Sequence, residues 1–526
     1  MIRILLSMYL AFVFVGKAIV EVLYRKRDMM AREGMSYLFV VYLLVLLAVA
    51  AVFYLLLTML HSRSRALILV QQQPNKRSVG LFIGVFAAVL GVYLMYYYMY
   101  YPFEVSGDVL TQWEQAHSMN INDHHPAFHT LLICLGTQVV DSYPFLIFVQ
   151  LILFAAGVAW LAVTLRAWGV PALLVALVTF LIAYGVHTRA IMFYTWKDTA
   201  MSLQMLFLLS QMVNLFWSRG EWLKKPLHWI SMAVLLAGIT LVRHNAVLFT
   251  FPLIVLLFVT YPRVRKSSAL AAGLCLLLVL GVKGPLYHVF RVTPSPNNYS
   301  ETIGLPMTIL SSVYSEEPEQ LSEEAYAFMS AFAPQEEFKE RYEFGNYNSV
   351  KWAYVTQEKL SELAPSPLQV LSMTWDAIRA ESVLAARSVL ALTDIVWDPT
   401  MDEVAYIGAL AGQPSDTDFL RIVPKLEMLC YDVTDILYQA FSNRVFNVIS
   451  SQIGFLMLVM LLAWYASRKV HGLTGLWLIL PILAYNFGTM LLLCGDDARF
   501  FHFNCLIAYP IAILLMSRNA QERNEE

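Results

Sequence analysis

The sequence predicts an all-α membrane protein with about twelve transmembrane helices, and its composition and its apolar runs lead to this class. Of 526 residues, 59% are apolar and 14% are charged, whereas soluble domains carry about 25% charged residues. Many apolar runs reach the ~20 residues that are needed to cross the hydrocarbon core of a bilayer. Such a composition excludes an ordinary soluble domain and indicates a multi-pass membrane protein.

The expected spans are predominantly apolar runs, and hydropathy gives their approximate limits. They are expected at Ile2–Leu23, Tyr37–Leu60, Val79–Tyr101, Tyr143–Leu165, Val170–Val186, Ala200–Trp217, Leu227–Val242, Asn245–Tyr261, Ser268–Phe290, Phe446–Trp464, Leu473–Leu493 and Phe501–Met516. The two spans on either side of Arg243-His244 are equally compatible with one long broken helix. The apolar run Pro126–Val140 is too short to span comfortably, so we expect a helix lying in the membrane interface there.

Lys and Arg are concentrated in loops on one side of the membrane in this scheme, and that side is predicted to be cytoplasmic. The residues concerned are Arg63, Arg65, Lys76, Arg77, Arg219, Lys224, Lys225, Arg263, Arg265, Lys266, Arg468 and Lys469. The segment Val105–Leu132 has no Lys or Arg and falls on the opposite, extracytoplasmic side. The first loop is an exception, because Arg25, Lys26, Arg27 and Arg32 also fall outside.

Four regions follow from this topology. They are an N-terminal transmembrane hairpin at 1–78, a transmembrane core at 79–290 with an outer loop at 102–142, an acidic domain at 291–445, and the last transmembrane helices with a short cytoplasmic tail at 446–526. The basic string after the first span, in place of a small-residue cleavage site, predicts a retained anchor. Arg291–Arg444 holds ten Lys and Arg against twenty-three Asp and Glu, which suits a mainly helical extracytoplasmic domain.

Three segments of the acidic region have recognisable local patterns. Glu316–Leu363 is polar and rich in Tyr, Phe and Glu, and it is predicted to be helical. Ser382–Val396 is predicted to be an amphipathic helix of the kind that lies on a membrane surface. The string Gly304-Leu305-Pro306-Met307 is predicted to be an apolar turn near the entrance of the domain.

The polar segment Val105–Leu132 is the first long one after a series of spans, and it is costly to keep at a bilayer surface without a function. Its ionisable residues include Asp108, Asp123, His124, His125 and His129. Ser106-Gly107 before Asp108 predicts the start of a helix, with Gln112 one turn later on the same face. We expect this segment, the predicted outer loop, to be the catalytic part of the protein.

Other polar and aromatic residues are expected to gather at the same outer face. They are Trp113 and Trp196, whose flat rings are of the kind that stack on sugars, Lys197-Asp198, Arg243-His244, Asp496-Asp497-Ala498-Arg499 and His502. Ionisable groups at membrane depth are costly and therefore suggest a function. Simpler roles stay open: an interfacial Lys197-Asp198 ion pair, an Arg243 side chain that reaches the lipid headgroups, Arg499 paired with Asp496 or Asp497, and histidines that bind nothing.

The His and Asp residues of the outer loop do not have the spacing of a tight metal motif. A divalent cation is possible, but no tightly bound metal and no other cofactor are expected. The sequence has no phosphate-binding Gly-rich loop, no dinucleotide fingerprint and no nucleophile elbow, so nucleotide-driven and serine-hydrolase chemistry are not expected. Nucleic acid is not expected as a partner.

The order of these elements resembles the GT-C-type integral membrane glycosyltransferases, and in particular an uncharacterised bacterial branch of GT-C-like proteins. In that family an apolar span is followed by an acidic residue early in the next loop and then by a His-Pro element that opens a juxtamembrane helix. In this chain the acidic residue lies in Ser106-Gly107-Asp108, and the His-Pro element is His124-His125-Pro126-Ala127-Phe128. Trp196-Lys197-Asp198 and Leu241-Val242-Arg243-His244-Asn245 are similar as well. The resemblance covers Val79–Phe290 and the last three spans. This chain has Gly-Asp where Asp-Glu is commonest, and His-Pro-Ala where His-Pro-Pro is commonest.

The resemblance implies a polyprenyl-phosphate-sugar donor, an acceptor reached from the extracytoplasmic side of the bacterial cytoplasmic membrane, and Asp108 as the catalytic acid residue of the first loop. Glycosyl transfer needs a base for the acceptor hydroxyl and positive charge where the phosphate leaves. We therefore expect Asp108 to be the base. The other expected roles are assistance by His124 and His125, phosphate binding by Arg243, Lys197 and Arg499, and substrate binding by Gln112, Trp113, Asp198 and His244.

The acceptor is expected to be a glycan, a lipid or a protein, and membrane lipids are expected to surround the spans. Two other functions stay open. A polymerase or ligase of envelope polysaccharide would share the large outer region and the lipid-linked donor. A transporter or flippase commonly has inverted repeats and broken helices at the midplane, whereas here no repeat is visible and the charges gather at one face.

Overall fold

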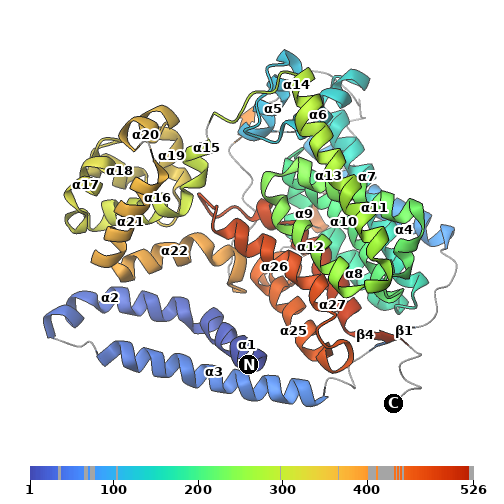
Figure 1. The fold of residues 1–526 in the computed structure, drawn as a ribbon, viewed down its shortest axis with the longest axis horizontal. Helices are drawn as coiled ribbons and strands as arrows, with labels where there is room; N and C mark the ends of the chain where they lie inside the picture. Colours follow the sequence, from blue (N-terminus) through green and yellow to red (C-terminus); the bar gives the residue numbers. More distant parts are fainter. Residues whose placement is uncertain are drawn as a thin grey trace. The chain divides into compact units, whose positions relative to one another are not determined.

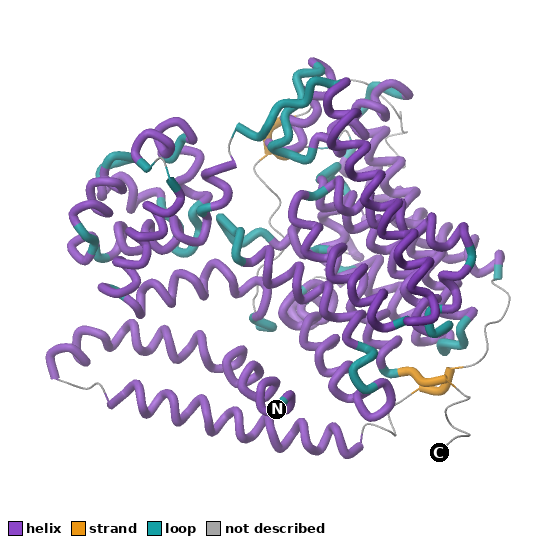
Figure 2. Tube along the Cα trace, in the orientation of Figure 1, coloured by secondary structure: helices purple, strands orange, loops and turns teal. Residues whose placement is uncertain are grey.

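The computed structural model describes residues 1–33, 37–63, 69–71, 78–101, 103, 105–296, 298–364, 366–400, 410–412, 432–433, 435–437, 439–440 and 443–519. These residues are almost entirely helical (Figures 1 and 2). The strands within them are two short pairs. β1 (Leu69–Gln71) pairs in parallel with β4 (Ser517–Asn519), and β2 (Val105–Ser106) pairs antiparallel with β3 (Leu410–Gly412). The prediction of an all-α class is confirmed.

Eight helices of the described chain are long and apolar enough to cross a membrane. They are Ile2–Arg27, Tyr37–Ser62, Val79–Tyr100, Tyr143–Ala167, Lys197–Trp217, Pro262–Val289, Ile453–His471 and Ala498–Leu515. Five shorter apolar helices of 10–17 residues accompany them: Ala127–Val139, Ala172–Tyr184, Pro226–Val242, His244–Thr260 and Leu476–Met490. The chain is therefore an integral, multi-pass helical membrane protein.

The expected number of about twelve spans is not confirmed, although each expected span coincides with a helix. The four expected spans at 170–186, 227–242, 245–261 and 473–493 are shorter helices. At 1.5 Å per residue, a helix such as Ala172–Tyr184 falls well short of the ~30 Å hydrocarbon core. The expected break at Arg243 is confirmed, because Arg243 is extended between two helical segments. The expected short helix after Pro126 is present at Ala127–Val139.

Contacts divide the chain into two compact units. The first unit is Met1–Ser64, Pro296–Pro399 and Phe487–Asp497, and the second is Arg65–Ser295, Thr400–Asn486 and Ala498–Glu526. The expected boundaries at 78, 290 and 445 divide the chain by membrane topology and stay a prediction. Of the expected acidic domain, 401–409 and 413–431 lie outside the described residues, as do the loop cations Arg65, Lys76 and Arg77.

The first unit contains long N-terminal helices and a cluster of shorter ones. Its helices are α1 (Ile2–Ala11), α2 (Lys17–Glu33), α3 (Tyr37–Arg63), α15 (Asn298–Thr302), α16 (Gly304–Glu316), α17 (Glu323–Ser330), α18 (Gln335–Arg341), α19 (Asn348–Tyr354), α20 (Gln357–Leu363), α21 (Pro367–Ala380) and α22 (Ser382–Trp397). The core of the cluster forms around α16, which lies among the other short helices in Figure 1. Met307, Leu310 and Tyr314 of α16 are buried together with residues such as Phe338 of α18 and Met373 of α21.

Three local predictions concern the helices of this unit. The amphipathic helix expected at Ser382–Val396 is present as α22, and the helical stretch expected at Glu316–Leu363 is four short helices, α17 to α20. The turn expected at Gly304–Met307 is wrong, because these residues form the first turn of α16. Pro306 is tolerated there because the first backbone N–H groups of a helix have no partner within it.

Cations of the first loop, which depart from the positive-inside pattern, form ion pairs within the first unit. Arg25 Nε lies 3.1 Å from Glu21 Oε1, and the guanidinium of Arg27 pairs with Glu317. Glu21 also accepts from Arg387 of α22 at 2.8 Å. These pairs partly neutralise the basic end of α2.

Gly304 gives a test of the packing at the start of α16. A Cβ at this position would collide with the carbonyl oxygen of Leu493 and would lie 2.7 Å from Cys494 Sγ. We expect Gly304→Ala to lower the free energy of unfolding by about 1–3 kcal/mol, because the backbone must shift. The matched control is Gly273→Ala in mid-helix, where a Cβ meets nothing within 4 Å. Thermal unfolding in detergent checks the prediction, and equal midpoints for the two variants contradict it.

The second unit holds the remaining helices. They are α4 (Val79–Tyr100), α5 (Gly107–Ser118), α6 (Ala127–Val139), α7 (Tyr143–Ala167), α8 (Ala172–Tyr184), α9 (Val186–Ile191), α10 (Lys197–Trp217), α11 (Pro226–Val242), α12 (Val247–Thr260), α13 (Arg265–Gly281), α14 (Tyr287–Val289), α24 (Arg444–Ser451), α25 (Ile453–His471), α26 (Leu476–Met490, of which the last residues belong to the first unit) and α27 (Phe503–Leu515). α10 is largely buried and packs against α7, α11 and α27. Its first residues, Lys197 and Asp198, are therefore held by the interior of the unit.

Candidate functional site

The helix that carries Asp108 starts where the sequence predicts. α5 begins at Gly107, directly after the extended residue Ser106. Ser106 Oγ accepts a hydrogen bond of 2.6 Å from the indole N–H of Trp196, the residue that precedes α10. This bond ties the start of α5 to the start of α10. Asp108 lies in the first turn of α5, where the helix dipole favours a negative charge.

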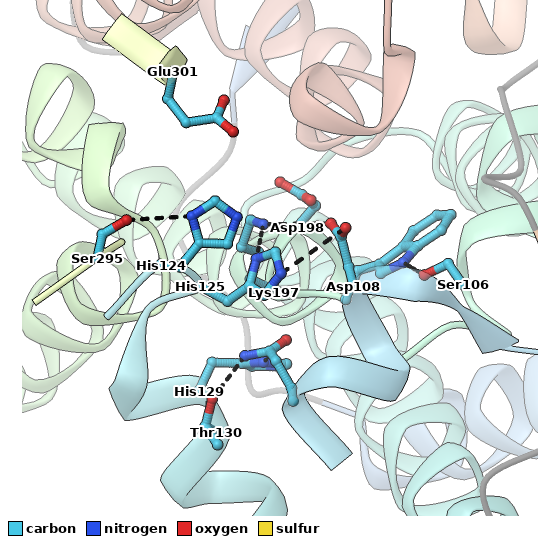
Figure 3. Close-up of polar contacts among 12 residues, drawn as sticks. Ser106, Asp108, His124, His125, His129, Thr130, Lys197, Asp198, Ser295 and Glu301 are labelled. Carbon is cyan, nitrogen blue, oxygen red and sulfur yellow. Dashed lines mark hydrogen bonds and ion pairs between the residues drawn. The ribbon is translucent and has the colours of Figure 1, made fainter. Parts of the chain in front are cut away.

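Two cations and a histidine surround the carboxylate of Asp108, and Figure 3 shows Lys197 and His125 beside it. Arg499 lies 3.0 Å from Oδ2, Lys197 Nζ lies 3.6 Å from the same oxygen, and His125 Nε2 lies 4.0 Å from Oδ1. Burial alone would raise the pKa of Asp108, but Arg499 and then Lys197 lower it below its usual range. The carboxylate is therefore ionised, and with 31% of its side chain exposed it remains within reach of solvent.

A second carboxylate, Asp198, lies deeper and is held by two arginines. The guanidinium of Arg243 pairs with Asp198, and Arg499 Nε lies 4.0 Å from Asp198 Oδ2. The side chains of Asp198 and Arg243 are 2% and 6% exposed, so this pair is fully buried. Arg499 thus contacts both carboxylates. We call Asp108, Lys197, Asp198, Arg243 and Arg499 the charged cluster.

The charged cluster combines three cations and two carboxylates. Arg243 is also fixed by a 2.7 Å hydrogen bond from Nε to Asn245 Oδ1 and by the ring of Phe500, whose centroid lies 4.4 Å away. A buried, paired Arg243 differs from the simpler expectation of a side chain that reaches the headgroups. Neither Asn245 nor Phe500 was an expected site residue; Asn245 lies two positions after Arg243, and Phe500 directly follows Arg499.

His125 is a neutral side chain that contacts two residues of the charged cluster, Lys197 and Asp108. The ammonium of Lys197 donates to His125 Nδ1 at 2.9 Å, so Nδ1 is the acceptor and the proton of the ring is on Nε2. Burial, followed by the nearby Lys197, holds the pKa of His125 well below its ordinary value. The neutral ring therefore directs an N–H toward Asp108.

The other two expected histidines of the loop have different surroundings. The ring of His124 lies 4.6 Å from that of His125, and its Nδ1 lies 3.3 Å from Ser295 Oγ. His129 is buried, and its Nδ1 hydrogen bonds to Gln112 Oε1 at 3.1 Å. Gln112 also donates to Thr130 at 3.0 Å, so Gln112 and His129 join α5 to α6 inside the unit.

The two expected sugar-stacking rings are buried. Trp113 is 6% exposed and packs between Tyr143 and His117. Trp196 is 1% exposed, stacks on Tyr194 with centroids 4.4 Å apart, and has the guanidinium of Arg499 4.9 Å from its ring centroid. Their rings are covered by protein groups, so the expectation of open platforms for a sugar is corrected for both residues.

Two further expected residues, His502 and His244, make their hydrogen bonds with residues other than Asp108. His502 is fully buried between Ser202 and Thr188, at 2.9 Å and 3.1 Å, which is the environment of a structural histidine. His244 lies against Asp123 and is 43% exposed. Among the described residues, no three His, Cys, Asp or Glu side chains are grouped to hold a metal ion.

The chain matches no family model, no curated protein and no solved structure. The helices define its class as a multi-pass membrane protein.

Proposed function

We propose that the protein is a GT-C-type membrane glycosyltransferase. It moves a sugar from a polyprenyl-phosphate donor to an envelope glycan, lipid or protein acceptor on the extracytoplasmic face of the bacterial cytoplasmic membrane. The observation that carries the proposal is the convergence of three cations from distant parts of the chain, Lys197, Arg243 and Arg499, on one pair of carboxylates.

The cluster suits a phosphate that gains charge during a reaction. A polyprenyl-phosphate sugar is a phosphodiester with one negative charge, and the leaving phosphate gains a second as the sugar departs. Arg499 and Lys197 are partly exposed, at 13% and 17%, so a phosphate can reach them. Arginine presents a planar fork that matches phosphate oxygens. Cations fixed in advance stabilise the growing charge without reorganising.

Asp108 has a second role in this proposal beside the one expected from the sequence. That Asp108 is the base stays a prediction. Its contacts support another function, because a carboxylate within 3.6 Å of both Arg499 and Lys197 offsets the repulsion between the two cations and holds them side by side for a phosphate. A carboxylate whose pKa is lowered by two cations is also a weak proton acceptor while those cations remain beside it.

A lipid-borne donor agrees with the apolar surface next to the cluster. α6 begins two residues after His125, and it exposes Leu132, Leu135 and Val139, at 41%, 64% and 70%. An exposed apolar helix face of this kind is suited to hydrocarbon, whether from membrane lipids or from a polyprenyl tail. The donor then brings its energy in the sugar–phosphate bond, so no nucleotide is needed.

Replacement of Asp108 tests the proposal. We expect Asp108→Asn to lower sugar transfer by about 10- to 100-fold, because it removes charged hydrogen bonds of about 1.5–3 kcal/mol to the two cations. The measurement is transfer from radiolabelled decaprenyl-phosphate hexoses and pentoses by purified protein in liposomes. The control is Asp376→Asn on α21 of the first unit, which is expected to keep the wild-type rate.

Undiminished transfer by a folded Asp108→Asn variant contradicts any role for Asp108. A ladder of products, instead of single additions, would favour the polymerase alternative. Counterflow of a labelled solute without sugar transfer would favour a transporter.

A further inference from the structure

Asp123 and His244 form a second polar pair in the second unit, with a geometry that fixes the imidazole tautomer. His244 Nε2 lies 2.9 Å from the backbone oxygen of Asp123 and 4.0 Å from its carboxylate Oδ1. A carbonyl oxygen only accepts, so Nε2 carries the proton in this contact. In the neutral ring the lone pair is then on Nδ1. With 43% of its side chain exposed, His244 is open to solvent.

The carboxylate of Asp123 is itself held in place. One oxygen accepts from the backbone N–H of Ala127 at 2.9 Å, at the start of α6. The hydroxyl of Tyr287, which lies close to Asp123, accepts from the backbone N–H of Phe128 at 3.0 Å. The backbone N–H of Asp123 bonds to Thr293 O at 2.9 Å. A fixed carboxylate beside the N–H of an imidazole both orients the ring and stabilises its protonated form.

This pair adjoins the charged cluster through both of its residues. His244 directly follows Arg243, whose guanidinium is locked on Asp198. Asp123 is followed by His124 and His125, and His125 contacts Lys197 and Asp108. A proton acceptor and a phosphate-binding group are thus held on neighbouring stretches of backbone. Asp108, by contrast, has its carboxylate occupied by cations.

We propose that His244, in place of Asp108, is the catalytic base of the transfer, with Asp123 as its positioning residue; this inference rests on the proposed glycosyltransferase function. Nδ1 takes the proton of the acceptor hydroxyl as that oxygen bonds to the anomeric carbon of the donor sugar. The bond from this carbon to the phosphate oxygen breaks, and its electron pair leaves with the phosphate toward Lys197 and Arg499. The resulting imidazolium is paired with Asp123 and then releases its proton to water.

His244→Gln tests the inference, because the glutamine amide can still donate to Asp123 O but cannot take a proton at neutral pH. We expect kcat to fall about 100-fold or more, with the KM for a decaprenyl-phosphate sugar within about twofold of wild type. The acidic limb of the pH–rate profile should disappear in the variant. The charged groups that act on His244 are Asp123, Lys283 and Lys197, and all three remain. The control is His288→Gln, a change of an exposed residue on α14.

A second measurement separates a base from a structural residue. His244→Ala should be rescued by added imidazole, which supplies a free base, whereas Asp123→Asn should lower kcat without such rescue. If His244→Gln keeps the wild-type kcat or the wild-type acidic limb while the wild-type protein transfers sugar, the base assignment is overturned and the proposed function stands. If the wild-type protein transfers no sugar from any decaprenyl-phosphate hexose or pentose, both are overturned.

Discussion

Replacement of Arg243 by Met is expected to lower the free energy of unfolding by about 3–5 kcal/mol, because it leaves the buried carboxylate of Asp198 without its main partner. The Asp198 side chain is 2% exposed, so water cannot replace the guanidinium. Arg499 compensates only in part, since its Nε lies 4.0 Å from Asp198 Oδ2. Unfolding of the detergent-solubilised protein by SDS, followed by Trp fluorescence, measures the loss.

A second substitution separates the charge effect from the loss of side-chain volume. Adding Asp198→Asn to Arg243→Met should recover at least half of the lost stability, because the uncompensated charge is then gone. Lys224→Met is the matched control, since Lys224 pairs with Glu221 at 2.5 Å but both side chains are about half exposed. That change should cost less than about 1 kcal/mol. Similar losses for Arg243→Met and Lys224→Met would show that burial of the Asp198 pair does not matter.

Replacement of Arg499 by Gln is expected to lower sugar transfer by about 10²–10³-fold, the usual cost of one lost donor to a developing negative charge. Arg499 is the cation that contacts both Asp108 and Asp198, and it is 13% exposed and so accessible to a phosphate. Arg499→Lys should be intermediate, because it keeps the charge and loses the planar fork. Single-turnover transfer from a decaprenyl-phosphate sugar measures both variants.

The control for this prediction is Arg468→Gln, in the last turn of α25. It should leave the rate within about twofold of wild type, which is a change of less than about 0.5 kcal/mol in the barrier. A folded Arg499→Gln protein with the wild-type rate would remove Arg499 from phosphate binding.

The elements that the sequence predicted well are those set by local chemistry. Apolar runs cannot remain in water, so each expected span is a helix. Ser106-Gly107 before Asp108 predicted the start of α5, and Pro126 predicted the start of α6 one residue further on. At Gly304–Met307 the same local logic failed, because the packing of α16 against Leu493 and Cys494 outweighs the turn propensity of Gly and Pro.

Some of the expected site residues lie where the sequence suggested, and others do not. The sequence suggested that Lys197, Arg243 and Arg499 belong near Asp108, and the structure brings them together. The sequence did not suggest that the rings of Trp113 and Trp196 would be covered by protein groups. Burial of an aromatic ring depends on which helices pack beside it, and hydropathy carries no information on that choice.

The sequence by itself determined that this is a multi-pass helical protein, because the length and hydropathy of a run decide whether it forms an apolar helix. The tertiary structure decided which charges pair. Lys197 and Asp198 are neighbours in the chain, yet Lys197 pairs with Asp108 whereas Asp198 pairs with Arg243 and Arg499. Successive side chains on a helix point about 100° apart, so the two face different elements, and only the packing of α5, α10 and α11 determines which elements those are.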